Sequence, residues 1–129
     1  PTRRSSDLAH PIESALLPDD GPGWCAAGPG PQTIRLVFDP PQSLHRIRLE
    51  FRESTAARTQ EYVLRWSADG GKEFADIVRQ QWNFGPNGAT HQVEDHVVDL
   101  PGVTVLQLDI TPDIGGGNSH ASLAQLRLA

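Results

Sequence analysis

Apolar and polar residues alternate one by one along most of this chain. The clearest run is His45–Arg52, in which Ile47, Leu49 and Phe51 alternate with charged residues. A period of two is typical of a β-strand that buries one face. The same kind of pattern predicts further strands over Thr33–Phe38, Glu61–Ser67, Phe74–Trp82, Gln92–Leu100, Val103–Ile110 and Ser122–Leu128.

Turn-forming residues separate the predicted strands. Pro40-Pro41, Asp69-Gly70-Gly71 and Pro101-Gly102 each fall between two such runs, and these residue types favour tight turns. No segment carries the apolar spacing of a helix over three turns. About seven or eight short strands at this spacing predict an all-β fold, an antiparallel sandwich of two sheets. The apolar parity of each strand predicts that five leucines are buried together: Leu36, Leu49, Leu64, Leu108 and Leu126.

Composition narrows the class of protein. The chain has 129 residues, which suits a flexible N-terminal segment over residues 1–10 and a single domain over residues 11–129. The single cysteine, Cys25, forms no internal disulfide. A net charge of −5 gives no electrostatic basis for direct nucleic-acid binding. No apolar run approaches the roughly 20 residues of a membrane-spanning helix, and the sequence does not indicate a compartment.

The order of the strands predicts where the long loops meet. Antiparallel strands alternate in direction, so alternate loops lie at the same end of a sandwich. The short loops at Asp39–Leu44, Ala68–Glu73 and Pro101-Gly102 therefore share one end. The long loops share the other end, and long loops are commonly functional. These long loops are Pro18–Gln32, Glu53–Gln60, Asn83–His91 and Thr111–Ala121.

The order of motifs resembles that of discoidin domains, also called coagulation factor 5/8 type C domains. YVLRWSADGGKEF (Tyr62–Phe74) is similar to their signature of a strand, a Ser-x-Asp-Gly turn and an aromatic residue. IESALLPDDGPGW (Ile12–Trp24) resembles their first loop, which runs from Asp-Gly to Trp. QTIRLVFDPPQSLHRIRLEF (Gln32–Phe51) resembles their first strands, and VTVLQLDITPDIGGGNSHASLAQLRL (Val103–Leu128) their closing pair. The resemblance covers nearly the whole chain after residue 11.

The resemblance implies an eight-stranded jelly roll of the galactose-binding-like fold. Members of this family include carbohydrate-binding modules, lectins, lipid-binding domains and the amino-terminal domain of a DNA-repair scaffold protein, so function does not follow from fold. We expect a non-catalytic domain that binds a glycan or another small polar ligand. A protein-interaction module is the alternative. A small hydrolase is the least favoured, because no Gly-x-Ser-x-Gly elbow is present.

The long-loop end contains the candidate ligand-binding residues. Trp82, Asn83 and Phe84 suit a sugar platform, because aromatic rings stack on sugar rings and amides bond hydroxyls. Alternatively, Trp82 closes the end of the core. Arg52 and Glu53 point toward these loops, and Arg52 offers a planar set of donors, although a surface ion pair is the favoured interpretation of the two residues. Two further candidates lie in the Gly-rich loop, namely Asn118 and His120.

Metal and membrane binding are less well supported. The family resemblance implies a structural calcium, for which Asp19 and Asp20 are the candidate ligands. However, Gln125 stands where the family places a glutamate, and an amide is a poorer calcium ligand, so we expect no calcium requirement for folding. A zinc site at Glu94 and His96 would need a third ligand from elsewhere. The acidic net charge and few exposed apolar loop residues argue against a membrane partner.

Overall fold

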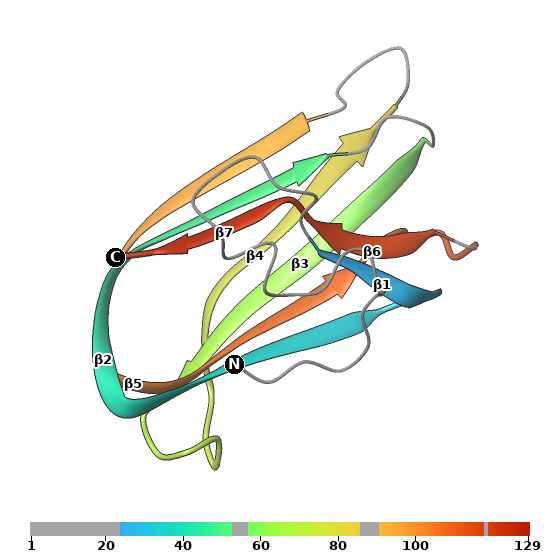
Figure 1. The fold of residues 1–129 in the computed structure, drawn as a ribbon. Helices are drawn as coiled ribbons and strands as arrows, with labels where there is room; N and C mark the ends of the chain where they lie inside the picture. The colour runs from blue at the N-terminus through green and yellow to red at the C-terminus, as the bar shows by residue number, and fades with distance from the viewer. Residues whose placement is uncertain (1–23, 53–56, 86–90, 118) are drawn as a thin grey trace.

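The computed structural model describes residues 24–52, 57–85, 91–117 and 119–129, and within these ranges the fold is all-β (Figure 1). No helix able to span a membrane occurs in the described part. The described residues form seven strands: β1 (Trp24–Pro29), β2 (Gln32–Arg52), β3 (Arg58–Ser67), β4 (Ala75–Phe84), β5 (His91–Thr111), β6 (His120–Leu123) and β7 (Gln125–Leu128).

The strands form an antiparallel five-stranded sheet, β4-β3-β5-β2-β7, and a two-stranded sheet, β1-β6. Figure 1 shows that the long strands β2 and β5 curve round together at one end, so that their halves lie in two facing layers. The β2–β5 register is irregular between Val37 and Arg46, where this bend occurs. The predicted two-layer antiparallel sandwich is confirmed.

The bounds of the strands differ from the predicted bounds for a physical reason. Pro40-Pro41 and Pro101-Gly102 were expected to end strands, but they lie within β2 and β5. Proline removes one backbone donor at a time, and the pairing resumes with shifted register at Gln42–Val103 and Leu44–Leu100. Conversely, the expected last strand is divided at Ala124, whose backbone N–H donates to the Glu50 carbonyl at 2.8 Å.

The core lies between the layers. The five predicted leucines are all buried, with exposed fractions of 5% or less. Contacts also cross from layer to layer: the rings of Phe51 and Tyr62 have centroids 5.4 Å apart. The Tyr62 hydroxyl lies 2.8 Å from Nε2 of His96. Burial, with a smaller contribution from Glu94, raises the pKa of Tyr62 well above its usual range, so the phenol is neutral.

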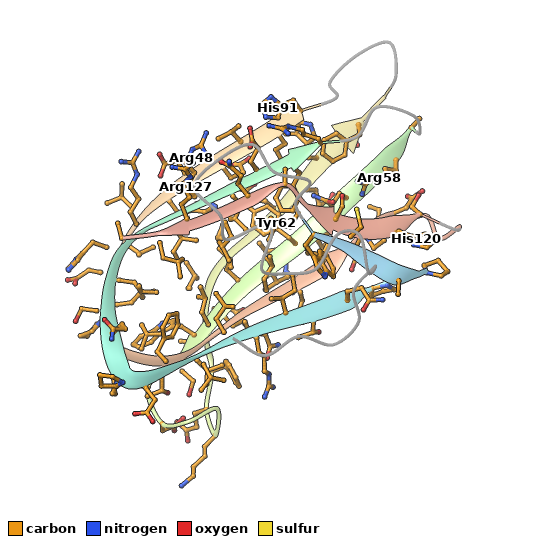
Figure 2. The ribbon with its side chains drawn as sticks, in the orientation of Figure 1. Arg48, Arg58, Tyr62, His91, His120 and Arg127 are labelled. Carbon is orange, nitrogen blue, oxygen red and sulfur yellow. The ribbon has the colours of Figure 1, made fainter. Side chains whose placement is uncertain are left out.

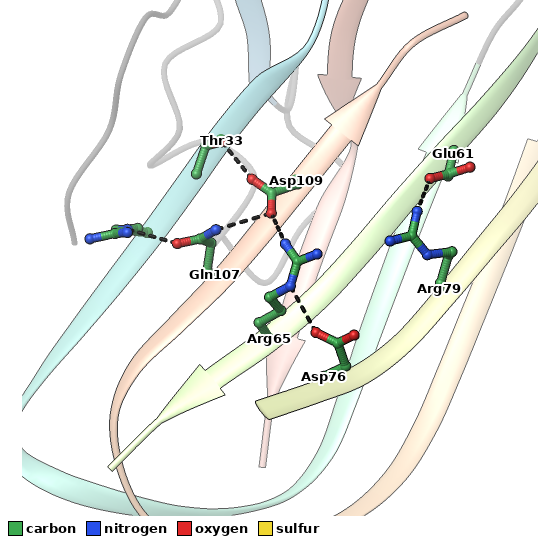
Figure 3. Close-up of polar contacts among 8 residues, drawn as sticks. Thr33, Glu61, Arg65, Asp76, Arg79, Gln107 and Asp109 are labelled. Atoms are coloured by element: carbon green, nitrogen blue, oxygen red, sulfur yellow. Dashed lines mark hydrogen bonds and ion pairs between the residues drawn. The ribbon is translucent and has the colours of Figure 1, made fainter. Parts of the chain in front are cut away.

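A polar network covers the outer face of the layer formed by β3, β4 and the adjoining halves of β2 and β5 (Figure 3). Arg65 joins Asp109 at 2.6 Å and Asp76 at 2.8 Å. Arg79 pairs with Glu61. Cross-strand pairs of opposite charge stabilise a sheet, so these ion pairs contribute to the stability of this layer.

The turn between β3 and β4 is organised by one carboxylate. Oδ1 of Asp69 accepts hydrogen bonds from the Ser67 hydroxyl at 2.6 Å and from the backbone N–H of Lys72 and Glu73 at 3.1 and 3.0 Å. These bonds, the one from Ser67 foremost, lower the pKa of Asp69. The following Gly70 has φ of +77°, a conformation that favours glycine. The turn predicted from Asp69-Gly70-Gly71 is therefore present.

Candidate functional site

The end of the sandwich opposite the bend contains the strand ends that the sequence predicts to meet. Figure 1 shows the end of β2, the start of β3, the end of β4 and the start of β5 gathered there. Of the predicted residues, Glu53, Asn118, Asp19 and Asp20 lie outside the described part of the chain. The others fall into three groups, centred on Arg58, Arg52 and His120.

Arg58 is the first residue of β3 and is only 5% exposed. Its Nη1 donates to Oε1 of Gln60 at 3.0 Å and to the Pro112 carbonyl at 2.7 Å. Its guanidinium carbon lies 5.0 Å from the centroid of the Phe84 ring, within the range of a cation–π interaction. Arg58 therefore joins β3, β4 and the segment after β5. Our sequence analysis missed it, although it shares the inward parity of Tyr62 and Leu64.

The predicted platform of Trp82, Asn83 and Phe84 is divided between two faces of β4. Phe84 is 3% exposed, so its expected role as a ligand-contacting ring is corrected to packing beneath Arg58. Trp82 is half-buried against the core. Asn83 is exposed on the opposite face, where its Oδ1 accepts a hydrogen bond from the Thr59 hydroxyl at 2.7 Å. Successive residues of a strand point to opposite faces, and a three-residue platform therefore does not form.

Arg52 ends β2 and pairs in register with His91 of β5. Its Nη2 lies 3.4 Å from Oε2 of Glu50. The other carboxylate oxygen of Glu50 lies 2.6 Å from Nε2 of His91. The Glu50 side chain is 8% exposed, whereas Arg52 is 49% exposed. A buried carboxylate thus orients an exposed guanidinium.

Arg52 also borders a small hollow of about 120 Å³ between β2 and the β1–β6 sheet. Trp24 and Cys25 of β1 line the other side of this hollow, with Ser122, Leu123 and Ala124. Trp24 is 2% exposed and packs into the core. The hollow brings Arg52 next to the first strand, as the loop arrangement predicted.

His120 begins β6 and is exposed. Its Nδ1 lies 3.1 Å from the Ala26 carbonyl of β1. Figure 2 shows His120 toward the β1–β6 side of this end, apart from Arg58 and His91. Within the described residues, no contact joins it to Arg52 or Asn83.

Buried polar groups are concentrated at this same end. Five of the six buried polar or charged residues in the described part lie near the strand ends here, and the sixth is Ser67. These five are Glu50, Arg58, Gln60, Gln92 and Gln125. Among the described residues, Nε2 of Gln60, Nε1 of Trp82 and Oε1 of Gln92 find no hydrogen-bond partner. Buried polar groups cost free energy unless they are hydrogen-bonded. This end therefore contains polar atoms that do not stabilise the core.

Among the described residues, no group of three or more His, Cys, Asp or Glu side chains could hold a metal ion. Gln125 is 5% exposed and pairs in register with Glu50. Glu94 accepts from Gln92 at 2.9 Å, and His96 contacts Tyr62. The two side chains considered for zinc are thus engaged with protein partners.

No family model and no curated protein matches the sequence, but the fold matches solved structures. Chitosan-binding module 1 from a Paenibacillus sp. IK-5 chitosanase/glucanase superimposes with a TM-score of 0.68 and 17% identity, over 99% of this chain and 92% of that one. The family 32 carbohydrate-binding module of C. perfringens NanJ, in complex with galactose, gives 0.64 and 16%, over 98% and 90%. Reduced XRCC1 bound to the catalytic domain of DNA polymerase β gives 0.61 and 15%, over 97% and 90%.

These matches define the class of fold. The chain has the β-sandwich of carbohydrate-binding modules and of an F5/8 type C domain, as the family resemblance implied. Because the matched structures include both carbohydrate-binding modules and a protein bound to a polymerase domain, fold alone does not select the ligand.

Proposed function

We propose that this domain binds a carbohydrate without catalysing a reaction on it, at the end of the sandwich opposite the bend. The observation that carries the proposal is the concentration of buried polar residues at this end. Natural proteins tolerate such departures mainly at functional sites. The fold match to modules described as chitosan-binding and galactose-bound supports a sugar as the ligand.

Arg52 is the central residue of the proposed site. Glu50 orients its guanidinium from one side, and the hollow beside Trp24 and Cys25 gives a ligand access from the other. Asn83 and His120 add exposed donors and acceptors at the same end. We retain Glu53 and Asn118 as further candidates, and Asp19 and Asp20 as candidate calcium ligands, from the sequence.

The proposal is tested by a glycan screen followed by calorimetric titration of variants. We expect Arg52→Ala to weaken binding by about 1–2 kcal/mol, since each sugar hydroxyl bond only replaces one made with water. Arg79→Ala is the matched control, because Arg79 is an exposed arginine on the outer face of the other layer. Titration with calcium and with a chelator tests the roles of Asp19 and Asp20. Equal affinity in folded wild-type and Arg52→Ala proteins would exclude this site.

Protein binding is the second candidate function. The match to XRCC1 in complex with a polymerase domain supports it. A stable protein interface buries about 800 Å² on each partner, and that area would extend beyond the hollow at Arg52. A domain that binds no glycan in the screen would favour this second function.

A further inference from the structure

A second hollow lies on the outer face of the layer formed by β7 and the adjoining halves of β2 and β5, away from the proposed sugar-binding end. It has a volume of about 340 Å³ and is lined by Arg46 and Arg48 of β2 and by Arg127, Leu128 and Ala129 at the end of the chain. Figure 2 shows Arg48 and Arg127 next to each other on adjacent strands. Three arginines therefore surround one concave surface on a chain whose net charge is −5.

The register places like charges directly opposite each other. Arg48 pairs with Arg127 of β7 on one side and with Asp95 of β5 on the other. Like charges directly opposite destabilise a sheet. Asp95 does not compensate Arg48 by a direct bond, because both of its carboxylate oxygens accept hydrogen bonds from Arg46. Among the described residues, no hydrogen bond or ion pair joins Arg48 to a carboxylate.

On the outer face of the layer that contains β3 and β4, by contrast, two arginines bond carboxylates. There, Arg65 bonds Asp76 and Asp109, and Arg79 bonds Glu61 (Figure 3). Arg48 thus differs from Arg65 and Arg79, because no carboxylate of the described residues bonds its guanidinium.

We propose that the hollow at Arg48 and Arg127 binds the carboxylate of an acidic sugar residue in a polysaccharide. Guanidinium groups match the planar geometry of a carboxylate with paired donors. Val97 pairs in register with Arg46 and is 86% exposed, so it offers an apolar surface for the C–H groups of a sugar ring. The kind of ligand rests on the proposed carbohydrate-binding function, whereas the position of the site rests on the arginines alone.

The size of the hollow favours a sugar over an acidic polypeptide. A volume of about 340 Å³ is at the lower end of the range for small-ligand pockets, roughly 300–1,000 Å³. A stable protein partner requires about 800 Å² of buried surface on each side. Only a local basic site can attract a polyanion to an acidic chain, since the overall field of the protein repels it.

The test is calorimetric titration with polygalacturonate, neutral galactan and polyglutamate. We expect polygalacturonate to bind, and Arg48→Ala and Arg127→Ala each to weaken its binding about tenfold. Arg79→Ala, which removes the same charge from the layer that contains β3 and β4, should leave it within about twofold. Asp95→Asn should strengthen binding a few-fold, because it removes a negative charge and releases Arg46. Binding should weaken as salt increases.

Each other outcome overturns the inference in a distinguishable way. Absence of polygalacturonate binding, or binding that Arg48→Ala leaves unchanged, excludes this site while leaving the Arg52 test with neutral glycans intact. Polyglutamate that binds as tightly as polygalacturonate, with the same dependence on Arg48, assigns the hollow to acidic polypeptides instead. Circular dichroism of each variant confirms that the loss of binding is not a loss of fold.

Discussion

Replacing Arg58 by methionine tests whether a buried guanidinium holds the candidate end together. Methionine keeps much of the length of the side chain but removes all donors. The Pro112 carbonyl and Oε1 of Gln60 then lose the donor that lies 2.7 and 3.0 Å away. Both acceptors belong to buried residues, and a buried acceptor without a donor costs about 1–3 kcal/mol.

Two further effects enter the magnitude. The loss of the contact with the Phe84 ring, now 5.0 Å from the guanidinium carbon, removes roughly 0.5–2 kcal/mol of cation–π attraction. Against this, the variant no longer buries a charge, and replacing a buried ion by an apolar group recovers part of the loss. We therefore expect the free energy of unfolding to fall by about 2–4 kcal/mol.

The assay is equilibrium unfolding in urea, followed by tryptophan fluorescence and far-UV circular dichroism. Arg79→Met is the matched control, because Arg79 is an exposed arginine of the adjacent strand β4, and exposed ion pairs contribute about 0–1 kcal/mol. A loss below about 1 kcal/mol in Arg58→Met, or an equal loss in both variants, would contradict the assignment of Arg58 as a buried tie between β3, β4 and the segment after β5.

Two other predictions concern stability. Tyr62→Phe should lower the free energy of unfolding by about 1 kcal/mol in urea titration, because it removes the hydroxyl that contacts His96 between the layers; an unchanged midpoint would show that this contact does not stabilise the fold. Asp69→Asn should lower the melting temperature at neutral pH, because the ionised carboxylate binds the turn. Since the pKa of Asp69 is lowered from 3.8, its stabilisation is present above that pH and is lost as the pH falls below it. The melting temperatures of wild type and variant should therefore converge in acid, and a constant difference would refute this account.

The core could be predicted from the sequence because parity alone decides which strand residues are buried. Leu36, Leu49 and Leu64 each follow the period of their own strand, so no knowledge of neighbouring strands is needed. Arg58 carries the same parity signal, but a charged residue at an inward position is expected to be exposed. Its burial depends on Pro112 and Phe84, which come from other parts of the chain.

The predicted platform at Trp82–Phe84 failed because we did not apply strand parity to it. We grouped three adjacent residues by chemical type, whereas strand geometry places Asn83 on the face opposite to Trp82 and Phe84. Likewise, Pro40-Pro41 gave a correct location for the reversal of the chain but not its form. Whether hydrogen bonding continues round a bend depends on the register with a partner strand, here β5, and register with a distant segment is not visible in the sequence.

Register also decides what each arginine of this domain does. Arg79 bonds a carboxylate on the neighbouring strand, and Arg58 bonds a carbonyl and contacts an aromatic ring. Arg48 lies in register between Arg127 and Asp95, and no carboxylate of the described residues bonds it. Replacing these residues should therefore separate three results. Loss of Arg58 should reduce stability, loss of Arg48 should reduce affinity for an acidic polysaccharide without reducing stability, and loss of Arg79 should change neither by much. Composition counts the three residues as equal positive charges, and only the contacts that each one makes in the fold distinguish a structural arginine from one that is available to a ligand.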